Sequence, residues 1–276
     1  LQQVFGRYST FIYHIPSMQK MVQELTEESE YTQFIESESE PILFKDSLIL
    51  KNIGFSYRQS SSFSLESIDL EIQKNQVIGF VGETGSGKST LIDIIMGLLK
   101  PSDGTMMLDQ TIIEGETIRN WQALIGYVPQ DIYLSDNTLA ANIAFGESKD
   151  TMDLTRIKKA AKIAAIDTFI EHELPEGYDT FVGERGVRLS GGQRQRIGIA
   201  RALYRDPEVI IFDEATSALD NDTEKEVLKA INNAAKNRTV IMIAHRLNTL
   251  ENCDVIYKLA SGKIIQSGTY EEITKG

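Results

Sequence analysis

The spacing of apolar side chains changes twice along the chain. Over residues 1–25 apolar positions recur at steps of three and four, which places them on one side of an α-helix. Pro16 falls inside this segment, and because proline has no N–H for the helical ladder we expect it to kink or restart the helix. Residues 26–45 show no apolar period and indicate a linker, whereas strand-like and helix-like segments alternate over residues 46–276.

Short apolar runs alternate with helical patterns in this third part. Such alternation is typical of a mostly parallel sheet covered by helices on both faces, which predicts an α/β fold. The first two strands are expected to pair antiparallel, as a small N-terminal β subdomain. Residues 135–187 have no clear strand pattern and predict a helical insertion, within a helical subdomain over about 135–200. The expected strands are Leu48–Tyr57, Ser67–Ile72, Gln76–Val81, Gly126–Pro129, Val209–Phe212, Thr239–Ile243, Val255–Lys258 and Lys263–Gln266, and helical patterns occupy Lys88–Leu98, much of Leu154–Ile170, Gly192–Tyr204 and Thr223–Ala235.

The composition fits a globular protein and excludes several other classes. With 276 residues, 41% of them hydrophobic, the chain can build a core, and wholesale disorder is excluded. The single cysteine, Cys253, cannot form an intramolecular disulfide or a multi-cysteine metal site, which favours a reducing compartment. No stretch reaches the roughly 18 to 20 consecutive apolar residues that a membrane-spanning helix needs. The sequence starts Leu-Gln-Gln without an initiator Met, so we expect a piece of a longer protein.

The net charge of −12 is unevenly distributed. Seven glutamates and no basic residue lie between Glu24 and Glu40, so −7 of the −12 belongs to this solvated linker and −5 to the rest. A protein that binds nucleic acid without sequence preference needs lysines and arginines against the phosphates. The acidic balance therefore predicts no nucleic-acid partner.

A glycine-rich segment follows an apolar strand and opens a helix, which is the context required of the phosphate-binding pattern GxxxxGK[ST]. Its glycines allow backbone N–H groups to surround phosphate oxygens, and the helix N-terminus adds a favourable dipole. Lys88 brings positive charge to the β- and γ-phosphates, and the Ser89 hydroxyl can bind Mg²⁺. The alternative is a glycine-rich turn that binds nothing. The predicted phosphate-binding residues are Gly82, Glu83, Thr84, Gly85, Ser86, Gly87, Lys88, Ser89 and Thr90.

Two acids end the apolar strand at Val209–Phe212. At the carboxyl end of the strand, Asp213 would reach the metal directly or through water. Glu214 is one residue further on and could polarise the attacking water. Alternatively, both acids could help to start the following helix. Together with the phosphate loop, the pair favours a metal ligand and a catalytic base.

A second glycine element, Leu189–Gln193, precedes an arginine-rich helix. Ser190 can cap this helix, and Gly191 and Gly192 leave backbone N–H groups accessible to an anion, with Gln193 beside them. A single nucleotide bound to one chain has no evident need for two phosphate-seeking helix starts. The alternative is an ordinary capped helix.

With this LSGGQ motif, the phosphate loop and the Asp-Glu strand, residues 46–276 resemble the nucleotide-binding domain of ATP-binding cassette (ABC) transporters. The resemblance implies ATP and Mg²⁺ as cofactors and a P-loop NTPase core. It further implies head-to-tail pairing with a second nucleotide-binding domain, most simply a second copy. ATP would then lie between the phosphate loop of one copy and Ser190, Gly191, Gly192 and Gln193 of the other.

Further motifs match this family in chain order. Gln130 stands where the family has the glutamine that contacts Mg²⁺ and water, so Ser89, Gln130 and Asp213 are the implied metal residues. Asp220 ends a segment that resembles the loop at the dimer seam. His245 matches the histidine that contacts the γ-phosphate, and with Glu214, Lys88 and Gln130 it completes the implied catalytic set. Tyr57 resembles the aromatic residue that stacks on adenine, although a strand tyrosine packed in the core with Phe55 is the alternative.

Two segments resemble the exporter branch of the family: Thr180–Gly186, before the signature, and Asn142–Gly146, after Gln130. Exporter half-transporters carry six membrane helices ahead of this domain on the same chain. Residues 1–25 would then be the cytoplasmic end of the last membrane helix, and the domain would lie at the cytoplasmic face of the inner membrane. Overall similarity points toward bacterial exporters and flippases of lipid-linked glycans, but the cargo and the choice between homodimer and heterodimer cannot be read from these residues.

Three other functions fit the sequence less well. Soluble ABC ATPases of DNA repair or chromosome structure carry a long coiled-coil insertion, which this sequence lacks. A regulatory module that holds ATP without hydrolysing it has no use for Glu214 and His245. A P-loop kinase would leave the motif at Leu189–Gln193 unexplained.

Overall fold

The computed structural model describes residue 7 and residues 11–22, 42–57, 64–183, 186–216, 219–244 and 246–275. The chain divides into two compact units, residues 1–41 and 42–276. In the first unit residues 11–22 are helical, and the helix continues through Pro16 instead of restarting there. A proline removes one bond of the ladder, and the other bonds of the segment hold the helix across it. Of the helices in the described ranges, none is both long and apolar enough to cross a membrane.

The second unit contains two sheets, of which the first is antiparallel throughout. Its strands lie in the order β2-β1-β4-β5, and Leu50 of β1 pairs with Leu70 on one side and Met106 on the other. Both strands of the expected antiparallel start are thereby confirmed. The strands of this sheet are β1 (Ser47–Phe55), β2 (Leu65–Gln73), β4 (Asp103–Leu108) and β5 (Thr111–Ile112).

The second sheet has six strands in the order β10-β9-β3-β8-β7-β6. Its neighbours are parallel except for the antiparallel pair β9 and β10, which confirms the expected mostly parallel sheet. All six strands match runs predicted from the apolar pattern to within about two residues. They are β3 (Val77–Val81), β6 (Ile125–Val128), β7 (Val209–Asp213), β8 (Thr239–Ala244), β9 (Val255–Ala260) and β10 (Lys263–Gly268).

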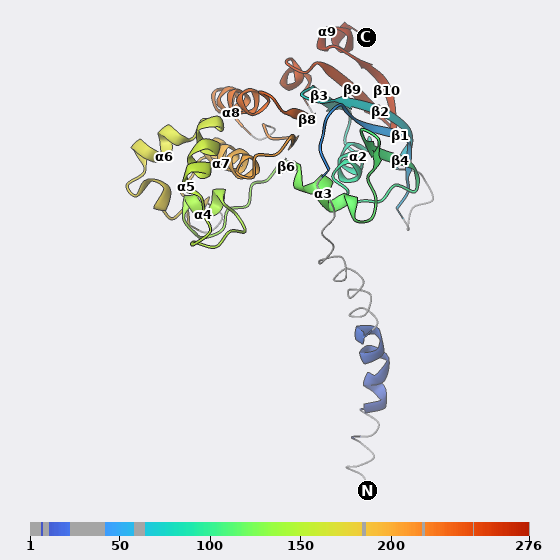
Figure 1. Cartoon of the computed structure of the whole chain (residues 1–276), viewed down its shortest axis with the longest axis horizontal. Coiled ribbons are helices and arrows are strands. Elements are labelled where there is room, and N and C mark those ends of the chain that lie inside the picture. Colours follow the sequence, from blue (N-terminus) through green and yellow to red (C-terminus); the bar gives the residue numbers. More distant parts are fainter. Residues whose placement is uncertain are drawn as a thin grey trace. The chain divides into compact units, whose positions relative to one another are not determined.

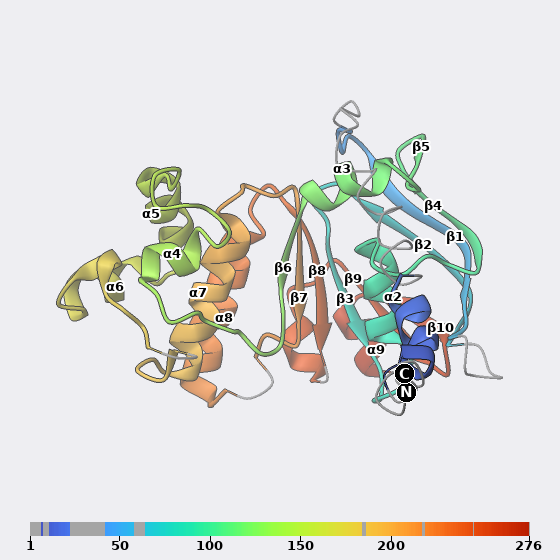
Figure 2. The same ribbon diagram turned by 90° about the horizontal axis from the view of Figure 1, so that it is seen from below.

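Helices gather on both sides of the parallel sheet. Figures 1 and 2 show α2 between the two sheets and α4 to α8 on the opposite side. Within the expected helical insertion, the described residues contain no strand beyond a single bridge between Thr138 and Phe181. The helices are α2 (Lys88–Ile95), α3 (Thr117–Ala123), α4 (Leu139–Ile143), α5 (Leu154–Ile163), α6 (Asp167–Glu173), α7 (Gly191–Leu203), α8 (Asn221–Ala234) and α9 (Tyr270–Lys275), with 3₁₀ turns at Gly177–Asp179 and Leu247–Leu250.

The parallel sheet separates two hydrophobic cores. Successive residues of a strand face opposite sides, so Ile211 and Ile241 join the core around α2 while Ile210 and Phe212 join the core under α7 and α8. Strands buried on both faces need no polar alternation, which explains the unbroken apolar runs in the sequence. Trp121 closes one end of the α2 core: it is fully buried, and its Nε1 donates a hydrogen bond to the Ile95 carbonyl at 2.6 Å.

Candidate functional site

The predicted phosphate loop connects the carboxyl end of β3 to the first residue of α2. Lys88 begins the helix, and its Nζ turns back to donate hydrogen bonds to the carbonyl oxygens of Gly82 at 2.7 Å and Glu83 at 2.9 Å. Burial lowers the pKa of Lys88, while the negative charges of Glu214 and Asp213 act in the opposite direction. The lysine is thereby held inside the loop, with acids from a different strand close enough to influence it.

Two glycines of the loop are required by close packing. A Cβ on Gly82 would lie 2.3 Å from the backbone oxygen of Leu259. Gly87 has a φ of 104°, and a Cβ there would lie 2.9 Å from the backbone oxygen of Ser64. Side chains at these positions would push the loop away from β2 and β9, so glycine keeps the loop against its neighbours.

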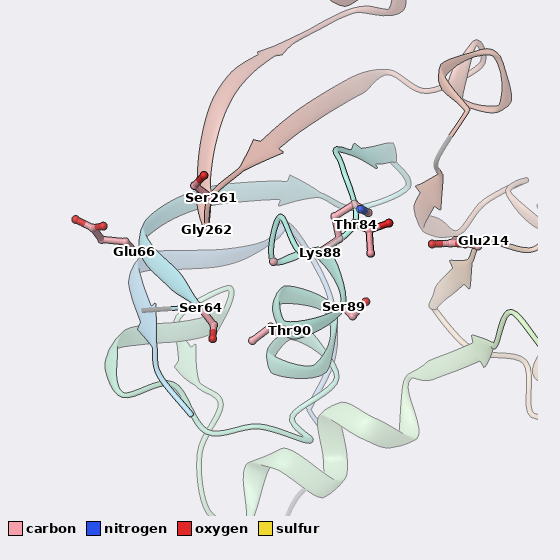
Figure 3. Close-up of a pocket in the computed structure, with 11 residues that line it drawn as sticks. Ser64, Glu66, Thr84, Lys88, Ser89, Thr90, Glu214, Ser261 and Gly262 are labelled. Atoms are coloured by element: carbon pink, nitrogen blue, oxygen red, sulfur yellow. The ribbon is translucent and has the colours of Figure 1, made fainter. Parts of the chain in front are cut away.

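The loop forms one wall of an open cavity of about 630 Å³ (Figure 3), within the usual range for small-molecule sites. Its lining contains hydroxyl groups, one lysine, two glutamates and the start of α2. Glu214 reaches toward the loop from the end of β7, on the other side of this cavity. The lining residues are Ser64, Glu66, Thr84, Gly85, Gly87, Lys88, Ser89, Thr90, Glu214, Ser261 and Gly262.

The two acids predicted at the end of the apolar strand, which is β7, differ in backbone conformation. Asp213 is the last residue of β7, and Glu214 adopts a left-handed backbone with a φ of 49°. That conformation is uncommon for a residue with a side chain, and it turns the backbone away from the line of the strand. The Glu214 N–H donates to the Ile243 carbonyl at 3.1 Å, which fixes the turn against β8. Asp213 therefore ends the strand, whereas Glu214 leaves it and lines the cavity.

The second glycine element starts α7 as the sequence predicts. Ser190 is the N-cap, with the Gln193 N–H donating to Ser190 Oγ at 3.2 Å and the Ser190 N–H donating to Gln193 Oε1 at 2.8 Å. Close packing requires glycine at position 192, because a Cβ there would lie 2.0 Å from Thr223 Cγ2. The capped helix is therefore real, and none of residues 189–193, all of them described, lines the phosphate-loop cavity.

Tyr57 is half exposed and so does not belong to the core, although it contacts the edge of it. Its ring meets the ring of Phe55 edge to face, with centroids 4.9 Å apart. Its Oη lies 3.3 Å from Thr90 Oγ1 of α2. Tyr57 thus combines the packing against Phe55 that was the alternative with a position beside the phosphate-loop helix.

Of the remaining predicted residues, the structure describes Asp220 and Gln130. Asp220 caps α8, since the N–H groups of Asp222 and Thr223 and the Thr223 hydroxyl donate to its carboxylate. Those hydrogen bonds lower the pKa of Asp220. Gln130 follows β6. His245 and residues 217–218 of the predicted seam loop lie outside the described residues.

The structure adds a residue that the motifs did not single out. Gln195 of α7 is buried, and its Nε2 donates to the Gln130 carbonyl at 3.2 Å and to the Ala215 carbonyl at 2.9 Å. This one amide joins the helix of the second glycine element to the segments that carry Gln130 and Glu214. Ser64 and Ser261 were also missed, because they reach the cavity from distant loops.

Comparisons with known proteins agree with this arrangement. A family described as ABC transporter matches residues 65–217. An ATP-dependent lipid A-core flippase of Cupriavidus pinatubonensis is 40% identical over 230 residues, covering 83% of this chain and 39% of that protein. Leukotoxin translocation ATP-binding protein LktB of Mannheimia glucosida is 43% identical over 231 residues, covering 82% of this chain and 32% of that protein.

A solved structure of a bacterial Atm1-family ABC exporter with ATP bound has a TM-score of 0.76 and 34% identity, covering 94% of this chain and 46% of the other. The chain spans about two fifths of the flippase and less of the toxin translocator. The family match extends over more than half of the chain. This chain therefore belongs to the ABC transporter family, as a nucleotide-binding domain of the exporter type.

Proposed function

We propose that the chain binds and hydrolyses ATP and, as part of a longer exporter, couples hydrolysis to movement of a membrane domain. The observation that carries the proposal is the cavity that places Lys88 and Ser89 at a helix start opposite Glu214. A phosphate-binding loop facing a carboxylate from another strand end supplies the two requirements of nucleotide hydrolysis, which are charge neutralisation and a positioned base.

The phosphate-loop residues Gly82 to Thr90 would hold the phosphates of ATP. The ammonium of Lys88 now bonds to two backbone carbonyls of the loop, from which it can turn to phosphate oxygens. The N-terminus of α2 adds unpaired N–H groups and the positive end of its dipole. The exposed face of Tyr57, beside Thr90, would receive the adenine ring.

Magnesium fits the oxygen donors assigned to it. Ser89, Gln130 and Asp213 offer a hydroxyl, an amide oxygen and a carboxylate, which are hard ligands. The described residues include no group of three or more His, Cys, Asp or Glu that could hold a metal. Magnesium usually takes one or two carboxylates and completes its shell with water and substrate phosphates. Bound there, the ion would neutralise charge on the β- and γ-phosphates.

Glu214 would accept a proton from the attacking water, or orient it, while His245 contacts the γ-phosphate. The left-handed turn at Glu214 and its backbone bond to β8 support this assignment, because they direct the side chain toward the loop. Gln195 would help to hold the base in position, because it bonds the carbonyl of Ala215, the residue after Glu214, to α7.

A second nucleotide-binding domain would complete each site. Within one chain, Ser190, Gly191, Gly192 and Gln193 lie outside the phosphate-loop cavity, although the start of α7 suits an anion. Head-to-tail pairing of two copies would bring this helix start to the γ-phosphate of the partner's nucleotide, with Asp220 at the seam. Two ATP molecules would then hold the pair together.

The rest of the exporter would include a membrane domain ahead of residue 1, with residues 1–25 as the cytoplasmic end of its last helix. The domain would accordingly work at the cytoplasmic face of the inner membrane. One relative is named for a lipid and another for a toxin. The proposal therefore concerns export or flipping as a reaction, with its cargo determined outside this chain.

Replacing the proposed base tests the hydrolytic step. Glu214→Gln keeps the size of the side chain but cannot accept the proton, so we expect turnover to fall by about 10²-fold or more, with ATP affinity retained. Phosphate release and equilibrium nucleotide binding measure the two quantities. The exposed Glu251→Gln is the control. Turnover near the unaltered level in Glu214→Gln would remove Glu214 as the base.

Replacing the loop lysine tests the phosphate site. Lys88→Ala removes a charge-assisted hydrogen bond, which is worth about 1.5–3 kcal/mol, so ATP affinity should fall by roughly 10- to 100-fold. A fluorescence titration with labelled ATP measures this, and Lys51→Ala on the exposed side of β1 serves as the control. Unchanged affinity in Lys88→Ala would contradict the phosphate cradle.

Removing the amide link tests whether Gln195 positions the base. Gln195→Ala removes this donor from the carbonyls of Gln130 and Ala215, and the bond to Ala215 is buried, so we expect a cost of about 1–3 kcal/mol of unfolding free energy. If the link also positions Glu214, kcat falls as well. Gln122→Ala is the matched control, because Gln122 Nε2 likewise donates to two carbonyls, those of Met96 and Gly97, at the far end of α2.

Urea unfolding and steady-state kinetics separate these effects. Both variants should lose stability, and only Gln195→Ala should lose kcat. An equal change of kcat in the two variants would reduce Gln195 to a structural role.

A further inference from the structure

A phenol that belongs to no motif lies beside the proposed metal carboxylate. Tyr127 is on β6, which pairs in parallel with β7, so the two strands end at the same edge of the sheet. Tyr127 Oη donates a hydrogen bond to Asp213 Oδ2 at 3.0 Å. The bond therefore joins the strand that leads to Gln130 to the carboxylate that ends β7.

Asp213 has other charged groups around it. Burial raises the pKa of Asp93 on α2, and the charge of Asp213 raises it further, so the two carboxyl groups repel each other. The charge of Asp213 also acts on Lys88, where it opposes the lowering of the pKa by burial. A tyrosine hydroxyl carries its proton at neutral pH and an ionised carboxylate can only accept, so the phenol is the donor in this bond.

We propose that Tyr127 is a positioning residue for the magnesium site: its hydroxyl holds Oδ2 of Asp213, and Oδ1 would be left for the cation or its water. This inference rests on the proposed nucleotide and metal site. An ionised carboxylate has about four acceptor positions, so the bond from Tyr127 leaves ample capacity for a metal or its water. Groups that hydrogen-bond to a metal ligand fix its orientation, and their loss typically costs about 10- to 100-fold in metal affinity or activity.

The test measures the contribution of magnesium to nucleotide binding. The affinity of the whole 276-residue chain for a fluorescent, non-hydrolysable ATP analogue is titrated in Mg²⁺ and in EDTA. The ratio of the two dissociation constants reports binding of the metal at the site without reference to turnover. For Tyr127→Phe we expect unchanged affinity in EDTA and an approximately tenfold smaller gain from Mg²⁺. Tyr133→Phe is the control, since Tyr133 is exposed and lies on the same segment beyond Gln130.

A double-mutant cycle shows whether the effect passes through Asp213. If it does, Tyr127→Phe should change the ratio much less in an Asp213→Asn background than in the unaltered chain. An unchanged ratio in Tyr127→Phe, or equal losses in Mg²⁺ and in EDTA, would overturn the inference. An effect that adds fully to that of Asp213→Asn would also overturn it.

These outcomes are distinct from a failure of the proposed function. In that case the unaltered chain would bind the analogue no better in Mg²⁺ than in EDTA, or would not bind it at all. The positioning role is judged only from the difference between variants once the unaltered chain shows a gain from Mg²⁺.

Discussion

The site depends on one geometric constraint: the carboxyl ends of β3 and β7 lie at the same edge of a parallel sheet, separated only by β8. Because all three strands run in the same direction, the residues that follow them emerge together. Lys88 follows β3 at the start of a helix, and Asp213 and Glu214 end or follow β7. Ligand sites of open parallel sheets form in this position. The lysine that would bind a phosphate and the carboxylates that would serve a cation and the water lie near each other because of this strand order.

Both hydrophobic cores maintain this edge. One fastens α2 to the inner face of the sheet, so that the start of α2 and Lys88 cannot move away from β3. The other fastens α7 and α8 to the outer face. Gln195 then links α7 to the backbone at Gln130 and Ala215, across the boundary between helices and sheet. Packing, and not the local loops alone, determines where the acids lie relative to the lysine.

The sequence predicts best what depends on local patterns. Unbroken apolar runs such as Val209–Phe212 identify the doubly buried strands, and the phosphate loop is readable because its glycines and lysine are consecutive. It predicts less where side chains are exposed or segments are short: β4 begins with three exposed residues, and only Trp121 of α3 is buried. Tyr127 and Gln195 carry no signal of their own, because their partners are 86 and at least 20 residues away and are brought close only by the sheet. A proline predicts a kink or a restart from local chemistry alone, whereas the helix at residues 11–22 continues past Pro16 without restarting.

A single copy offers one phosphate loop, and the start of its own α7 lies outside the cavity. The proposed reaction centre is therefore one that two copies share. The most direct measurement is the rate of ATP hydrolysis per molecule over a wide range of protein concentration. Sharing predicts that this specific rate rises with concentration toward a plateau and falls toward zero on dilution. A specific rate that stays constant down to concentrations at which only monomers are present would contradict it.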